Sequence, residues 1–303
     1  MKAKLNPSLT RKHYLGGLMI ALTGAILFST KAIVAKLIYR YHVDAVTLIG
    51  FRMAFSLPLF AAIAVWQMIK SPALRKSERW RLIGLGLVGY YLSSFLDFLG
   101  LQYITAGLER LILFLTPSFV LIMSALFFKR KVSTLELAAL VVSYLGIVLV
   151  FLHDLKFGGD NVLLGSAMVL GAAISYAVYL IQSGQMVTKI GSLRLVSYAM
   201  CVSSAACIAQ FFMLRPASML IQPVEVYWLS LINAVFCTVL PVFMTMIAVK
   251  RIGAATASQA GMIGPVSTLF LGAFFLDEAI TAWQLGGTAL VMGGMYLLSK
   301  KKA

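Results

Sequence analysis

Five ionisable residues stand inside stretches of sequence that are otherwise apolar. They are Lys31, Arg52, Asp97, Glu109 and Arg110. If these stretches cross a membrane, each isolated charge near the bilayer centre costs on the order of 3 kcal/mol, so such groups normally face a partner or a wet cavity. Three cations and two acids leave one positive charge unbalanced. That charge can receive a carboxylate or another anionic group of a substrate.

The same residues also allow a purely structural interpretation. Asp97 can pair with Arg52, and Glu109 with Lys31, in a network that closes one side of the protein and binds nothing. The two interpretations are compatible, because a gate can open when a substrate replaces one partner of an ion pair. The sequence leaves both open.

A second set of candidate substrate-binding residues is uncharged. These residues carry hydroxyl or amide groups at membrane depth, where such groups must find partners in protein or water. A cavity that combines aromatic rings with hydrogen-bonding groups suits amino acids or similar amphipathic metabolites. The alternative is that each side chain only packs. The set comprises Tyr90, Tyr176, Tyr179, Asn233 and Gln259.

The composition requires membrane-spanning helices to hold these residues. Of the 303 residues, 61% are hydrophobic and 12% are charged, and the mean hydropathy is +0.93, well outside the range of soluble domains. A span needs about 20 apolar residues. The sequence predicts an all-α membrane protein with ten spans: Tyr14–Leu37, Ala45–Ile69, Leu82–Tyr103, Ala106–Phe128, Leu135–Leu152, Val162–Ile181, Leu193–Leu214, Val226–Val249, Ala254–Leu276 and Ile280–Leu298.

Basic residues between the spans predict the orientation. With the amino terminus inside, 19 of the 26 Lys and Arg residues fall on the cytoplasmic side and three fall outside, as the positive-inside rule requires. Both termini are therefore expected in the cytoplasm. Lys36 and Arg40 are expected to reach the outer interface. The net charge of +16 is then a topology signal, and we expect a lipid bilayer and no nucleic acid as a partner.

An internal repeat with an offset of 148 residues relates the two halves of the chain. The segment that begins at Ile104 aligns without a gap with the segment that begins at Ile252, so Pro117 meets Pro265 and Gly146 meets Gly294. Five spans per repeat force the two copies into opposite orientations, the inverted-repeat plan of many secondary transporters. "KRK" at residues 129–131 and its partner "DEA" at 277–279 fit that inversion.

These features resemble the EamA family of the drug/metabolite transporter superfamily over essentially the whole chain. The resemblance rests on the ten spans, the two halves, the segments of Pro117 and Pro265, each followed by "ALFF" or "AFFLDE", and the late glycines. It implies one EamA repeat in residues 1–153 and a second in 154–303. The first half has "KRK" where family members often carry an acidic residue, a departure that the orientation of the charges explains.

Proline and glycine predict where the helices can bend. Pro117 and Pro265 cannot donate a backbone hydrogen bond, so the fourth and ninth spans should kink there, and Gly261 and Gly264 loosen the second site. Repeat-related kinks are candidate hinges for alternating access. Glycines give the tenth span a small-residue face that predicts close packing or a homodimer surface: Gly286, Gly287, Gly293 and Gly294.

Other classes of protein lack the residues they need. The three histidines lie at helix ends or in loops and Asp97 is the only aspartate in an apolar run, so neither a metal centre nor an aspartyl dyad is expected, and we predict no enzyme, metal or cofactor. No repeated ring of polar residues predicts a channel. Proton-coupled export of cationic drugs or amines remains an alternative, disfavoured because Lys31 stands where small multidrug exporters carry a glutamate.

The sequence therefore predicts a multi-pass secondary carrier of the bacterial cytoplasmic (inner) membrane. Its small-molecule substrate is expected to be an amino acid or a related carboxylate metabolite, moved by alternating access. Export as the direction is implied only by the family resemblance. Proton coupling through Asp97 or Glu109 is left open.

Overall fold

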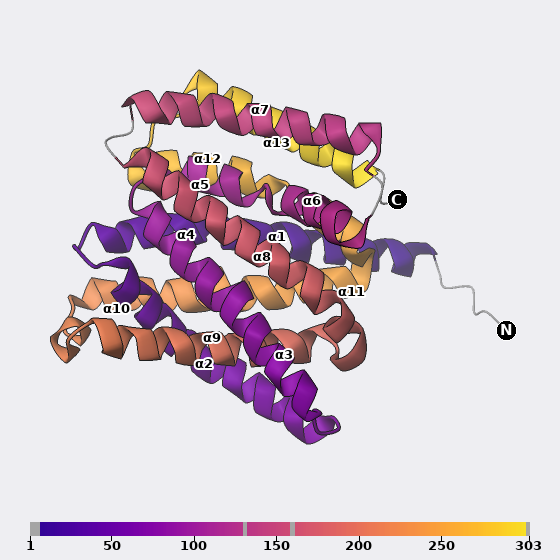
Figure 1. Cartoon of the computed structure of the whole chain (residues 1–303), viewed down its shortest axis with the longest axis vertical. Helices are drawn as coiled ribbons and strands as arrows, with labels where there is room; N and C mark the ends of the chain where they lie inside the picture. Colours follow the sequence, from indigo (N-terminus) through magenta and orange to yellow (C-terminus); the bar gives the residue numbers. More distant parts are fainter. Residues whose placement is uncertain (1–6, 130–131, 158–160, 301–303) are drawn as a thin grey trace.

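The computed structural model describes residues 7–129, 132–157 and 161–300 as a bundle of helices. The helices run side by side, and the start of the first and the end of the last lie at the same end of the bundle (Figure 1). We call this end the terminal end and the opposite one the far end. The all-helical prediction is confirmed.

The first repeat supplies five spans, of which the third and fourth are each built from more than one helical segment. The third combines α3, a π-helical segment η1 and α4, and the fourth combines α5 and α6. The segments are α1 (Pro7–Tyr39), α2 (Ala45–Lys70), α3 (Lys76–Gly86), η1 (Leu87–Leu92), α4 (Ser93–Leu101), α5 (Ala106–Leu113), α6 (Thr116–Phe128) and α7 (Thr134–Phe157).

The second repeat follows the same order of spans. Its eighth span contains the π-helical segment η3, and α11 continues past that span into the ninth through Gly253, whose φ of 82° breaks the helix. The segments are α8 (Val162–Ile190), α9 (Ser192–Leu214), the short 3-10 turn η2 (Ala217–Leu220), α10 (Val224–Ala234), η3 (Val235–Val239), α11 (Leu240–Ala260), α12 (Ile263–Leu276) and α13 (Ala282–Lys300).

The 148-residue repeat is visible in the backbone as well as in the sequence. The two π-helical segments begin at Leu87 and Val235, which are 148 positions apart. The left-handed residues that end α6 and α12, Lys129 and Asp277, are related by the same offset, with φ of 50° and 59°. A π-bulge and a left-handed cap are local backbone features, so their recurrence shows that the two halves share one fold.

The two repeats interleave through helix pairs that mostly join one half to the other. The most extensive contacts are α7 with α13, α2 with α9, α1 with α11 and α4 with α8. Small residues allow the first pair to pack closely, since a Cβ at Gly287 would lie 2.5 Å from the Gly146 carbonyl oxygen and one at Gly294 would lie 2.6 Å from that of Ala139. Much of the glycine face of α13 therefore packs within the chain.

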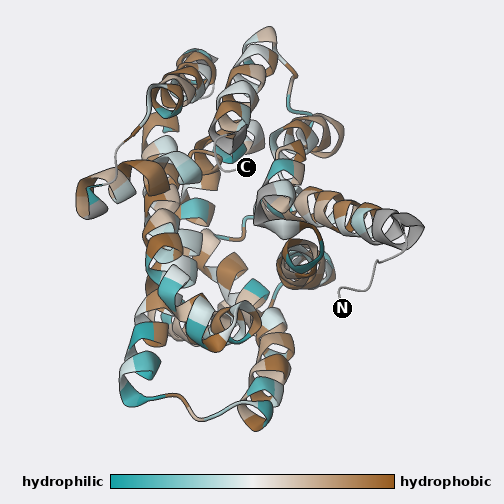
Figure 2. Ribbon diagram, turned by 90° about the vertical axis from the view of Figure 1, so that its right-hand side faces the viewer, coloured by the Kyte–Doolittle hydropathy of each residue, from teal (hydrophilic) through white to brown (hydrophobic). Residues whose placement is uncertain are grey.

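Eight spans in the described residues are long and apolar enough to cross a membrane, the first from Tyr14 to Tyr39 and the eighth from Val224 to Ile252. α12 is shorter because the chain breaks before it, and α13 completes the ten spans. Figure 2, which shows the molecule from the terminal end, has many of the helices foreshortened, and apolar residues occur on all parts of the bundle. The chain is thus a multi-pass integral membrane protein.

Candidate functional site

A central cavity of about 290 Å³ brings together six of the ten residues predicted to bind substrate. Its walls come from the first four spans and from the sixth, seventh and eighth, so both repeats contribute. The predicted residues that line it are Lys31, Arg52, Tyr90, Asp97, Arg110 and Tyr176, and Pro117 lies beside them.

Lys31 pairs with both acids of the cluster. Its ammonium group donates a hydrogen bond to Asp97 Oδ2 and lies 3.1 Å from Glu109 Oε1, and all three side chains are buried. The predicted pair of Lys31 with Glu109 is confirmed. The predicted pair of Asp97 with Arg52 is wrong, because Asp97 lies against Lys31 of α1 and Arg52 has another partner.

Arg52 of α2 bonds to the eighth span. Its Nε donates to Thr238 Oγ1 at 2.9 Å, and the hydroxyl of Thr238 donates in turn to the Asn233 carbonyl oxygen at 2.9 Å. The guanidinium carbon lies 4.9 Å from the Phe98 ring centre, a cation–π contact. Arg52 Nη1 is buried and has no hydrogen-bond partner among the described residues.

Arg110 of α5 is also a buried guanidinium without a carboxylate. Its carbon lies 5.2 Å from the Phe28 ring centre, and its Nε has no hydrogen-bond partner in the part of the chain that the structure describes. Lys31 Nζ lies 5.6 Å from the same ring and 5.3 Å from Phe98. Two phenyl rings therefore stand between three cations, which spaces the positive charges.

Asp97 keeps one acceptor free beside these cations. Oδ2 is engaged by Lys31, while Oδ1 is buried and lacks a hydrogen-bond partner among the described residues. Ser93 and Ser94 line the same cavity, and the Ser93 hydroxyl donates to the Ala172 carbonyl oxygen at 3.1 Å. The arginines thus have N–H donors without acceptors, and Asp97 has an oxygen without a donor. A buried polar group without a partner costs free energy until a ligand or water bonds to it.

The other side of the cavity is aromatic. The ring centres of Tyr90 and Tyr179 lie 4.9 Å apart and their hydroxyls 3.2 Å apart. Tyr176 stacks on Tyr179 at 5.5 Å. Gly89 makes this packing feasible, because a Cβ there would lie 2.3 Å from the ring of Tyr179. The cavity therefore has one charged wall and one aromatic wall.

Four of the ten predicted residues do not line the cavity. Glu109 and Tyr179 lie directly behind lining residues, and Asn233 is buried with its amide nitrogen 3.3 Å from the Lys31 carbonyl oxygen. Gln259 is exposed on α11 and lines neither this cavity nor the next. Its helix turns Ala257 and Gly261 inward, and a residue midway between them faces away.

Thr238, Phe28 and Met200 belong to the site but escaped sequence reasoning. The repeat offset was the available signal: Thr238 is the partner of Tyr90, Phe28 of Tyr176 and Met200 of Arg52. Inverted repeats place equivalent positions around a common centre, so the partner of one lining residue is itself a candidate.

The predicted kinks are confirmed as breaks in the two helices. α5 ends at Leu113 and α6 begins at Thr116, with Pro117 in its first turn. α11 ends at Ala260 beside Gly261, and Pro265 lies in the first turn of α12. Each proline falls just after the break, where its missing N–H has no helical partner to lose.

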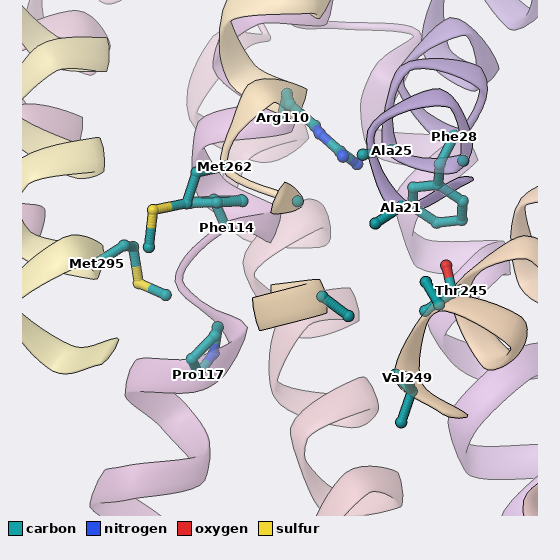
Figure 3. A pocket seen from close by; sticks show the side chains of 14 residues that line it. Ala21, Ala25, Phe28, Arg110, Phe114, Pro117, Thr245, Val249, Met262 and Met295 are labelled. Atoms are coloured by element: carbon teal, nitrogen blue, oxygen red, sulfur yellow. The ribbon is translucent and has the colours of Figure 1, made fainter. Parts of the chain in front are cut away.

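A second cavity of about 360 Å³ adjoins the central one toward the terminal end. Four residues line both cavities: Phe28, Arg110, Phe114 and Pro117. In Figure 3 the Arg110 side chain extends into this space toward Ala25 and Phe28 of α1. Along α1 the lining passes from Ala21 to Phe28 and then to Lys31, so the two cavities follow each other along the bundle axis.

Toward the far end, polar contacts close the path. Tyr39 donates to the Phe98 carbonyl oxygen at 2.7 Å. Glu278 lies 3.1 Å from Lys36 Nζ and accepts hydrogen bonds from the Ala106 N–H at 3.1 and 3.2 Å. Exposed or partly exposed pairs follow further out: Arg40 with Asp277 at 3.8 Å and Arg215 with Asp44 at 3.1 Å. The conformation therefore closes the site at the far end.

This arrangement is suited to holding and releasing a small polar molecule. It contains cations, an acceptor and aromatic rings around a cavity, between two breaks in repeat-related helices. No cluster of three metal-ligating side chains occurs in the described residues. A ten-span inverted repeat with a closed far end and a central polar cavity defines a membrane transporter.

The comparison with protein families agrees with that class. The model of the EamA-like transporter family matches twice, over residues 15–152 and 163–300, and the two matches are again 148 positions apart. The chain belongs to the EamA-like transporter family, within the drug/metabolite transporter superfamily. The family is one of transporters, which agrees with the prediction that the chain is not an enzyme.

Relatives of this chain are described as uncharacterized transporters. The uncharacterized transporter YcbK of Bacillus subtilis is 30% identical over 92% of this chain and 92% of its own. An uncharacterized transporter of Archaeoglobus fulgidus is 24% identical over 85% of this chain and 89% of its own. A protein of known crystal structure superposes on 95% of this chain with a TM-score of 0.63 and 16% identity, which supports the fold alone.

Proposed function

We propose that this chain is a secondary transporter that moves amino acids or related carboxylate metabolites out of the cytoplasm by alternating access. One observation carries the substrate class. Arg52 and Arg110 line a single cavity, and neither has a carboxylate within 4 Å among the described residues. Guanidinium groups bind carboxylates in bidentate fashion, so a substrate carboxylate fits this wall.

Asp97 favours an amino acid, rather than a carboxylic acid without an amine, as the substrate. Its free Oδ1 lies in the same cavity as the two arginines and can accept from a substrate ammonium group. Tyr90 and Tyr176 line the cavity and offer the apolar faces of their rings to a substrate side chain. A zwitterion with an apolar body would satisfy the charged and the aromatic walls together.

The orientation and direction are part of the proposal. The loops of the terminal end hold most of the basic residues, among them Arg75, Lys76 and Arg79, which supports termini in the cytoplasm of a bacterial inner membrane. The structure would then face the cytoplasm, ready to load a substrate for export. The family resemblance supports export, and a homodimer remains a prediction from the sequence.

A thermal-shift experiment with matched ligands tests the substrate class, because a ligand that binds only the folded state raises the melting temperature. The probes are L-leucine, its analogue without the amine (4-methylpentanoate) and its analogue without the carboxylate (3-methylbutylamine), with the corresponding set for L-phenylalanine. We expect the amino acid to stabilise the protein most, the acid less and the amine not at all.

Two variants tie the result to the site. Arg110→Gln should abolish the shift, whereas Arg40→Gln, which changes a half-exposed arginine at the far end, should leave it unchanged. Stabilisation by the amines and by cationic drugs, but by no carboxylate compound, would overturn the proposal. Export of cationic compounds, with Asp97 and Glu109 as the recognising groups, would then be the better account.

A further inference from the structure

A groove of about 410 Å³ lies between the third and sixth spans at the terminal end, apart from the central cavity. Exposed polar residues stand at its mouth, and the buried side chains of Leu85 and Met186 form its floor. The residues that line it are Arg81, Gly84, Leu85, Val88, Ile181, Gln182, Gln185 and Met186.

The groove changes from polar to apolar along the membrane normal. Val88 lies seven residues beyond Arg81, which is about 10 Å along a helix. On the antiparallel α8, Gln185 lies nearer the terminal end than Ile181. Trp80, next to Arg81, is 65% exposed, and tryptophan is enriched at the level of lipid headgroups. Arg81 therefore stands at headgroup depth, and Val88 lies at the depth of acyl chains.

The charge at the mouth is positive and uncompensated. Arg81 has no ion pair among the described residues, and no acidic residue lines the groove. Two glutamines beside it can donate amide hydrogens. A mouth with a free guanidinium and two amides, above an apolar trough, matches a phosphate group that is joined to a hydrocarbon chain.

We propose that this groove binds one anionic phospholipid from the leaflet at the terminal end. Arg81 receives the phosphate, the glutamine amides bond to the headgroup, and one acyl chain lies over Gly84, Leu85 and Val88. The chain then ends beside η1, since Gly89 and Leu180, the sequence neighbours of Val88 and Ile181, line the central cavity. This inference does not depend on which substrate the transporter carries.

Two pairs of variants distinguish the contribution of the Arg81 charge to lipid binding from that of the apolar trough. Gly84→Leu fills the trough, because nothing lies within 4 Å of a Cβ at that position, and Gly184→Leu is its control, a glycine with equally open surroundings outside the groove. Arg81→Gln removes the charge at the mouth. Arg79→Gln removes an exposed arginine two positions earlier, on the opposite side of the helix.

The test measures lipid binding to the full-length protein in detergent by native mass spectrometry. The probes are palmitoyl-oleoyl-phosphatidylglycerol, the matching phosphatidylcholine and soluble glycerol 1-phosphate. We expect one phosphatidylglycerol to bind in preference to the other two. Arg81→Gln should weaken binding about fivefold, the effect of one basic residue near an anionic surface, and Gly84→Leu should abolish it, while both controls bind as the wild type does.

Four results would overturn the proposal. Equal binding of phosphatidylcholine would show that the anionic headgroup is not recognised. Equal loss in Arg81→Gln and Arg79→Gln would show general attraction to a basic surface. Unchanged binding to Gly84→Leu would show that no acyl chain lies in the groove. Binding of glycerol 1-phosphate as tight as that of the lipid would likewise contradict a lipid site.

Discussion

Lys31 illustrates how a buried cation can be both costly and structurally necessary. It lies between two carboxylates in a layer that separates the central cavity from the far end. An ion pair of this kind contributes little net stability, but removal of one member leaves uncompensated charge in a low dielectric. Beyond the ion pairs of Lys31, the cluster keeps buried polar atoms without a hydrogen-bond partner among the described residues on Arg52, Arg110, Asp97 and Glu109.

Lys31→Ala should destabilise the protein by about 3–5 kcal/mol, because Asp97 and Glu109 would remain buried without their shared cation. The measurement is denaturant or thermal unfolding in detergent. Addition of Asp97→Asn and Glu109→Gln to the same variant should recover most of the loss, since the triple variant buries no charge at this place. A single variant as stable as the wild type would show that Lys31 does not hold the two acids.

Gly264 sets the position of Arg110. A Cβ at Gly264 would lie 2.4 Å from Arg110 Nη2, so Gly264→Ala should displace the guanidinium and weaken substrate binding while the fold persists. Gly293→Ala is the control, because open space surrounds that position. The ligand-induced thermal shift measures the effect. If Gly264→Ala binds substrate as the wild type does, Arg110 does not receive the substrate in the position observed.

At this scale the sequence predicted the members of the charged cluster but not all of their partners. Counting residues along a helix gives the depth of Arg52 and Asp97 in the membrane. This depth was enough to predict that the charged residues lie in one layer. It does not give the direction in which each helix faces. That direction depends on how α1, α2 and α4 pack, so the pairing of Asp97 with Lys31 could not be derived.

Contacts at the start of α5 hold the far end of the bundle closed. Glu278, just beyond α12, accepts from the Ala106 N–H and pairs with Lys36 of α1, so one carboxylate joins three spans. It also caps the amino terminus of the helix that carries Glu109 and Arg110, where a negative charge is favourable.

Glu278→Gln should weaken this closure and shift the population toward a state that opens at the far end. Gln102 and Glu278 line a separate pocket at the far end. A cysteine in place of Gln102 should then react faster with a membrane-impermeant maleimide applied from the far side. Arg40→Gln is the control, since its exposed pair with Asp277 is expected to contribute little. Equal labelling rates in all three proteins would contradict a closing role for Glu278.

Some breaks in the helices could be predicted from the sequence and others could not. Proline predicted the breaks in the fourth and ninth spans because its missing N–H is visible in the sequence. The π-helical segments were not predicted, since neither "LVGYYL" nor "VFCTV" departs from ordinary apolar helix in composition. They position Tyr90 and Thr238, and only packing between the repeats reveals them.

For the whole molecule, the repeat explains why the site is asymmetric in charge although the fold is nearly symmetric. The partners of Lys31, Arg52 and Asp97 are Tyr179, Met200 and Thr245. The far-end barrier is therefore ionic, whereas the repeat-equivalent positions carry no charge. The ten spans could be predicted because apolar runs are visible in the sequence, and the repeat because its offset is constant. Neither feature requires knowledge of how the helices pack.

The orientation in the membrane is a prediction for the whole chain. Green fluorescent protein fused after the last residue should fluoresce, and alkaline phosphatase fused there should be inactive, because the distribution of basic residues favours a cytoplasmic terminus. Alkaline phosphatase inserted after Glu225, in the acidic far-end loop, should be active. The reverse pattern of activities would invert the proposed direction of transport.

Release of substrate from proteoliposomes shows whether an amino acid passes through the central cavity. Proteoliposomes loaded with the radiolabelled amino acid that gives the largest thermal shift are diluted into buffer, and the release of label is followed for the wild type, Arg110→Gln and Arg40→Gln. We expect release by the wild type and Arg40→Gln, and none by a folded Arg110→Gln. Equal release by all three proteins would show that substrate does not pass through the central cavity, and no release by the wild type would contradict amino-acid transport.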